Sequence, residues 1–115
     1  MLPKEQRISG REIFFLKQEK IQPIYGKVFG MVYKENMKVQ KFGIIIPNKI
    51  VNKSFLRNKI KRLLFNLIRK FSFKTSGYFL FLAKKQASLC NKDEFESDLL
   101  LLKRKLNEDI NIVTN

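Results

Sequence analysis

The chain has 115 residues, of which 44% are hydrophobic and 12% aromatic, and its 24 Lys and Arg against 10 Asp and Glu give a net charge of +14. This length and composition predict one folded domain over residues 1–115 and exclude a disordered chain. Histidine is absent, which removes the commonest general base and metal ligand. We therefore expect no catalytic residues and no metal ligands in the protein.

The location of the protein follows from two negative observations. No segment approaches the roughly 20 apolar residues of a membrane span, and the first residues contain no apolar run typical of a secretory signal. The single cysteine, Cys90, cannot form an internal disulfide, which favours a buried or idle thiol in a reducing compartment. We expect a soluble, cytoplasmic, monomeric protein that does not bind membranes.

The positive charge is concentrated in the middle of the chain. No acidic residue lies between Glu35 and Asp93, and the excess of basic side chains in that stretch equals the net charge of the whole protein. Such a segment repels itself in the folded state and calls for a polyanionic partner. Nucleic acid is the first candidate and an anionic membrane surface the second.

The hydrophobic pattern predicts helices and strands in alternation. In chain order they are a helix capped by Ser9 and ending at about Lys20, strands over 25–34 and 41–46, a helix over 53–71, a strand over 78–83 and a helix over about 93–107. In the first helix we expect Ile13, Leu16 and one or both of Phe14 and Phe15 to point inward. Additional short strands could lie within 21–41. This order predicts an α+β fold, a two-layer sandwich in which helices pack on a small sheet.

The helix over 53–71 carries the strongest functional signal. Its inward stripe recurs at helical spacing, through Leu56, Ile60, Leu63, Leu64, Leu67 and Phe71. The remaining surface is positive, and charges of one sign cannot form the pairs that decorate an ordinary solvated helix. Phe65 is expected among these charges, where an exposed ring could stack on a base. These features favour nucleic-acid contact over a merely solvated face.

The acidic cluster at the start of the last helix has a simpler interpretation. Carboxylates in the first turn complement the helix dipole, and Asp93 and Glu96 have the spacing of a capping box. The other members of the cluster are Glu94 and Asp98. We therefore do not expect a metal site there.

The segment Arg57-Asn58-Lys59-Ile60-Lys61-Arg62-Leu63 is very similar to the Arg-Asn-Arg helix motif of bacterial ribonuclease P proteins. Further landmarks of that family occur in order along the chain. They are Arg7-Ile8, Phe42-Gly43-Ile44-Ile45-Ile46 with Asn48-Lys49, and Gly77-Tyr78-Phe79-Leu80-Phe81-Leu82-Ala83-Lys84. The sequence thus resembles this family over essentially its whole length.

The resemblance implies a fold and a role. The crossover through the basic helix would be left-handed, against the usual rule. The partner RNA would carry out the chemistry with Mg²⁺, and the protein would bind ribonuclease P RNA and the 5′ leader of precursor tRNA. The implied RNA-binding residues are Arg57, Asn58, Lys59, Lys61, Arg62 and Lys49. The charge of the helix over 53–71 adds Lys53 and Arg69 to these candidates. The implied candidates for a leader cleft are Phe14 or Phe15 of the first helix and Tyr33 or Phe29 of the first strand.

The sequence departs from the family pattern at three positions. Lys59 replaces the usual second Arg and loses its planar fork, Phe65 stands where a basic residue is common, and Asn48 replaces a usual lysine. A ribosomal or other structural RNA-binding protein is the main alternative. A major-groove DNA-binding protein and a peripheral membrane protein are weaker alternatives, since the basic helix follows a strand and its apolar stripe suits a sheet.

Overall fold

The computed structural model describes residues 3–71, 73–88 and 91–114, including every side chain except those of 88 and 107–114. Cys90 lies outside the described residues. The elements are η1 (Lys4–Gln6), α1 (Gly10–Gln18), β1 (Ile24–Tyr25), β2 (Phe29–Glu35), β3 (Gln40–Ile45), α2 (Ser54–Phe71), β4 (Gly77–Ala83), η2 (Lys85–Ser88) and α3 (Lys92–Thr114). The strand expected over 25–34 is divided by a turn into β1 and β2.

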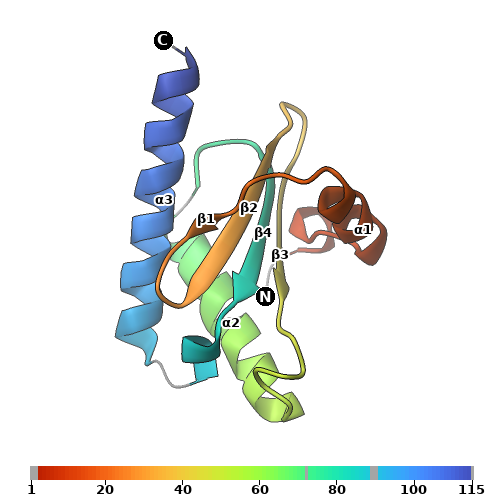
Figure 1. Ribbon diagram of the computed structural model, residues 1–115, viewed down its shortest axis with the longest axis vertical. Coiled ribbons are helices and arrows are strands. Elements are labelled where there is room, and N and C mark those ends of the chain that lie inside the picture. Colours follow the sequence, from red (N-terminus) through yellow and green to blue (C-terminus); the bar gives the residue numbers. More distant parts are fainter. Residues whose placement is uncertain (1–2, 72, 89–90, 115) are drawn as a thin grey trace.

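The four strands form one mixed sheet in the order β1-β2-β4-β3. β2 pairs antiparallel with both β1 and β4, whereas β3 and β4 are parallel and are joined through α2. In Figure 1 both parallel strands run downward while α2 returns behind the sheet, from the side of β3 toward β4. The crossover is therefore left-handed, as the resemblance implied.

The main core lies between the sheet and the helix layer formed by α2 and α3. Every second strand residue points into it, including Phe29, Met31, Phe42, Phe79 and Phe81, all at most 2% exposed. Rings meet edge to face within this core, for example Phe29 and Phe95 with centroids 5.2 Å apart. The expected sandwich of helices on a small sheet is confirmed.

The opposite face of the sheet is only partly covered. Leu16 of α1 packs there with Ile8 and Leu80 in a smaller apolar cluster. α1 begins at a capping box, in which the Ser9 hydroxyl accepts from the Glu12 amide and the Glu12 carboxylate accepts from the Ser9 amide. Beyond the edge of α1, the same side of the sheet carries the half-buried residues Val32, Tyr78 and Leu82, and we call this surface the open face.

The orientation of α1 differs from the expectation on one point. Phe14 and Phe15 are 58% and 56% exposed, so neither ring is inward. Ile13 and Leu16 alone turn toward the sheet. A short helix on the edge of a sheet has only one narrow contact stripe, and these residues occupy it.

Buried Asp98 ties α3 to the turn between β1 and β2. Its carboxylate accepts from the backbone N–H groups of Lys27 at 2.5 Å, Val28 at 3.0 Å and Phe29 at 2.9 Å. The expected pair of Asp93 and Glu96 does not cap the helix. The reciprocal bonds of a capping box form instead between Asn91, the residue just before α3, and Glu94 in its first turn.

Candidate nucleic-acid interface

One side of α2 is a continuous exposed stripe. Its members recur every three or four positions, so they lie on one helix face. They are Phe55, Asn58, Lys59, Arg62, Asn66 and Arg69, all exposed. Lys61 lies beside them and is half-buried, and Lys49 and Lys53 are exposed in the segment that leads into the helix. We call the set Phe55 to Arg69 the α2 stripe.

The cations of the α2 stripe lack partners within the described part of the chain. The ion pairs found there are Lys34 with Glu19, Lys41 with Glu12, and Lys70 with Glu96. Lys59, Arg62 and Arg69 take part in no hydrogen bond or ion pair among these residues. Their donors are directed to solvent and are available for phosphate oxygens.

Arg57 occupies a different environment from the other motif residues. Its Nη1 donates to the carbonyl oxygens of Ile46 at 2.6 Å and Val51 at 3.2 Å and to Oδ1 of Asn48 at 2.8 Å. The side chain is half-buried and ties the loop after β3 to the start of α2. The loop that carries exposed Lys49 is thus held in place by a residue that was expected to bind RNA.

The expectation for Phe65 is wrong. Its side chain is only 7% exposed and belongs to the main core. α2 contacts α3 and η2 as well as the sheet, so it buries a wider sector than one stripe, including Phe65 and Ile68. The exposed aromatic ring of this helix is Phe55, which is 65% exposed and lies on the α2 stripe.

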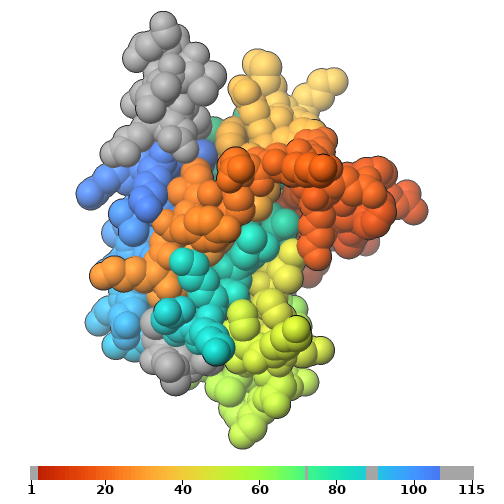
Figure 2. Space-filling model, in the orientation of Figure 1, coloured from red at the N-terminus to blue at the C-terminus, as the bar shows by residue number. Residues whose placement is uncertain are grey.

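The open face of the sheet forms a second candidate surface. Residues paired across the strands share a face, and the registers place Gly30 beside Leu82 and Val32 beside Leu80. Val32, Tyr78 and Leu82 are half-buried there, at the edge of the area that α1 covers. Figure 2 shows this side of the molecule, with β4 in teal reaching the surface between β2 in orange and β3 in yellow.

Two of the four cleft candidates point away from the open face. Phe29 is fully buried in the main core, so it cannot contact a leader. Tyr33 packs against Phe79 on the core side and donates its hydroxyl to the Ser76 carbonyl at 2.7 Å. Burial, with the charge of Glu35, raises the pKa of Tyr33. The structure brings Phe14 and Phe15 together, with centroids 6.0 Å apart, but not with these two rings.

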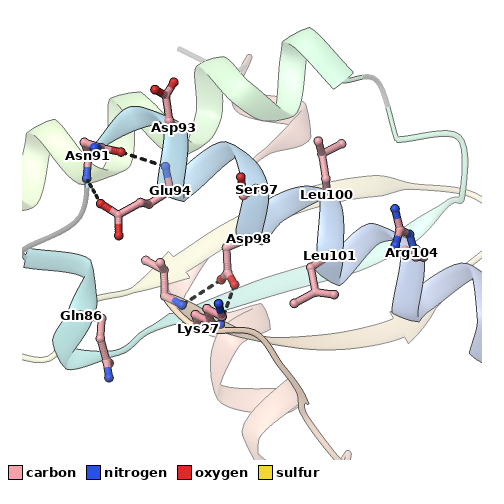
Figure 3. Close-up of a pocket in the computed structure, with 11 residues that line it drawn as sticks. Lys27, Gln86, Asn91, Asp93, Glu94, Ser97, Asp98, Leu100, Leu101 and Arg104 are labelled. Carbon is pink, nitrogen blue, oxygen red and sulfur yellow. Dashed lines mark hydrogen bonds between the residues drawn. The ribbon is translucent and has the colours of Figure 1, made fainter.

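A pocket of about 780 Å³ lies elsewhere, between the start of α3 and the turn after β1. Its lining includes the acids Asp93, Glu94 and Asp98 with the cations Lys27 and Arg104 (Figure 3). Asp98 is already occupied by backbone donors at the base of this pocket. Mixed charge and engaged carboxylates make this pocket a poor candidate for an RNA phosphate site.

Residues 2–107 match the family model described as Ribonuclease P. The chain belongs to the ribonuclease P protein family. Its fold is similar to that of the RNase P protein from Staphylococcus aureus, with a TM-score of 0.77 and 20% identity over 90% of this chain and 96% of that one. It is also similar to that of the RNase P protein from Thermotoga maritima, with a TM-score of 0.72 and 24% identity over 85% of this chain and 96% of that one. No curated protein sequence matches this one.

Family membership gives the chain its general role. It is the RNA-binding protein subunit of ribonuclease P, which processes the 5′ end of tRNA, and its partner is ribonuclease P RNA. No helix among the described residues is long and apolar enough to cross a bilayer.

Proposed function

We propose that the α2 stripe binds ribonuclease P RNA and that the open face, with Phe14 and Phe15, binds the 5′ leader of precursor tRNA. The observation that carries the first assignment is a stripe of cations that have no partner among the described residues, in a stretch of sequence that contains no acid. Exposed rings beside a sheet support the second, because unpaired bases stack on aromatic side chains.

We further propose that the RNA subunit carries out the cleavage with Mg²⁺ and that no side chain of this protein takes part in it. Among the described residues no group of three or more Cys, Asp or Glu side chains converges in a way suited to a metal ion. The protein would act by offsetting repulsion between two RNA molecules and by holding the leader. It would do so as a monomer in the cytoplasm.

The alternative is a structural RNA-binding protein without a role in cleavage. The two are separated by 5′ cleavage of precursor tRNA with the cognate ribonuclease P RNA at low Mg²⁺, with and without the protein. We expect stimulation by the wild-type protein and its loss when Lys59 and Arg62 are both replaced by Ala. Tight RNA binding without stimulation would support the alternative.

Arg57 is left out of this variant for a structural reason. Its guanidinium bonds to the loop after β3, so its replacement would disturb the fold as well as any RNA contact. Lys59 and Arg62 are exposed, so their replacement changes the charge of the surface and leaves the core intact. A double replacement of Lys92 and Arg104, exposed on α3, removes the same charge from another surface and is the matched control.

A further inference from the structure

An exposed tyrosine lies on the open face, at the edge of the sheet farthest from α1. Tyr25 of β1 pairs with Gly30 of β2, which in turn pairs with Leu82 of β4. Paired residues share a face, so the Tyr25 side chain lies on the same side of the sheet as Leu82 and α1. Tyr25 is 56% exposed. Figure 1 shows β1 and α1 at opposite edges of the sheet.

The Tyr25 ring packs against β2 at Gly30, where no side chain occupies the space. A Cβ atom at Gly30 would lie 3.2 Å from Cδ1 and 3.3 Å from Cε1 of Tyr25, closer than ordinary contact. The ring therefore rests directly over the backbone of β2. A larger residue at position 30 would push the ring off the sheet.

Two lysines surround this tyrosine. The Lys84 ammonium lies 5.0 Å from the ring centroid and donates to the Gly26 carbonyl at 2.6 Å. Lys105 donates to the carbonyl of Tyr25 itself at 2.7 Å. Neither lysine takes part in the ion pairs of the described chain. An exposed ring beside an ammonium suits a nucleotide, because the base can stack while the phosphate meets the cation.

We propose that Tyr25 and Lys84 form a binding site for one unpaired nucleotide of the leader, so that the leader crosses the open face from α1 to β1. This inference rests on the proposed function of that face. Neighbouring strands are about 4.8 Å apart, so the three intervals between β1 and β3 amount to roughly 14 Å. Tyr25 and the aromatic pair of α1 would therefore hold different nucleotides of the same strand.

The test uses the ribonucleoprotein reconstituted from the protein and its ribonuclease P RNA, with precursor tRNAs whose leaders are lengthened one nucleotide at a time. We compare the affinity of wild type, Tyr25→Ala, Tyr25→Phe and Phe14→Ala. Tyr25→Ala should weaken binding of long leaders about 5- to 150-fold, the equivalent of ~1–3 kcal/mol for one stacked base. Tyr25→Phe should bind as wild type does, since it retains the ring. The losses in Tyr25→Ala and Phe14→Ala should set in at different leader lengths.

The outcomes separate this inference from the function on which it rests. If Phe14→Ala weakens leader binding and Tyr25→Ala equals wild type at every length, the Tyr25 site is refuted and the leader surface remains. If no variant changes the dependence of affinity on leader length, both assignments are refuted.

A second measurement does not depend on the stability of the alanine variant. The sequence contains no Trp, so Tyr25→Trp introduces the single Trp of the protein at the site, and this Trp can be excited apart from the remaining tyrosines. Its emission should be quenched by precursors with long leaders and not by leaderless tRNA. Equal emission with both RNAs would overturn the proposal. Met37→Trp, at an 89% exposed position in the turn between β2 and β3, is the matched control and should respond to neither.

Discussion

α2 and α3 pack against the same face of the sheet, yet the acids of α3 and the exposed cations of α2 differ in their partners. Acids of α3 are engaged by the protein itself: Glu94 caps the helix, Glu96 pairs with Lys70 at 3.6 Å, and Asp98 binds three backbone N–H groups. Lys59, Arg62 and Arg69 of α2 contact no partner within the described residues. The acids of α3 therefore help to hold the fold together, whereas the outer side of α2 is the surface that we propose binds RNA.

The largest effect is expected on the inner side of α2. Phe65→Ala should reduce the free energy of unfolding by about 3–5 kcal/mol, because it removes a buried ring from the core. Phe55→Ala is the matched control in the same helix and should change stability by less than about 0.5 kcal/mol. Urea denaturation of both variants measures the difference. Equal losses would mean that the two sides of α2 are not distinct.

The next effect concerns Asp98. Asp98→Ala should reduce the free energy of unfolding by roughly 2–3 kcal/mol, since the N–H groups of Val28 and Phe29 stay buried without their acceptor. Hydrogen exchange at these two amides should speed up more than exchange in β4. Asp93→Ala removes an exposed carboxylate from the same helix and should leave both quantities unchanged. A similar loss in both variants would show that the clamp does not stabilise the turn.

Two arginines of α2 should separate folding from binding. Arg57→Ala should destabilise the protein by roughly 1.5 kcal/mol, because three acceptors lose a charged donor. Arg62→Ala should change the free energy of unfolding by less than about 0.5 kcal/mol and still weaken RNA binding. Thermal unfolding and RNA titration of each variant provide the measurements. A stable Arg57→Ala protein would assign Arg57 to the RNA surface after all.

The smallest effect is a pH dependence at the contact of α1 with β3. Burial raises the pKa of Glu12. The hydrogen bonds with Ser9 and Lys41 and the charge of Lys41 together outweigh this effect, so the pKa of Glu12 lies below its ordinary value of 4.5. A lowered pKa contributes stability above the ordinary value, and that contribution is lost as the pH falls through the folded pKa. Glu12→Gln should therefore lose less than about 1 kcal/mol at neutral pH and nothing in acid. A loss that persists in acid would exclude the charge as its cause.

The sequence predicted the order of the elements because their signals are local. The Ser9–Glu12 capping box and the alternation in β4 each depend on residues close together in the chain. The positive outer surface of α2 was expected on similar grounds, from helical spacing and the absence of nearby acids, but its exposed ring was assigned to Phe65 and not to Phe55. Local patterns also explain why the family motif could be placed on a helix surface.

The features that the sequence did not reveal share one cause, which is contact between distant segments. Phe65 is buried because α3 packs beside α2, and Asp98 binds Lys27 across 71 positions in the sequence. Tyr33 was placed in a cleft without reference to strand parity, which pairs it with core residue Phe79 and leaves Val32 on the open face. The exposed position of Tyr25 was missed for a similar reason. The side of the sheet on which its ring lies depends on the pairing of Tyr25 with Gly30 across the turn between β1 and β2.

The most direct test of the central claim is the affinity for ribonuclease P RNA as a function of salt. Replacing Lys59 and Arg62 by Ala should reduce the slope of log Kd against log salt concentration by about 2, one for each lost phosphate contact. The double replacement of Lys92 and Arg104 should leave the slope as it is in the wild type. An unchanged slope in the first variant, or an equal reduction in both, would contradict the assignment of the α2 stripe as the RNA-binding surface.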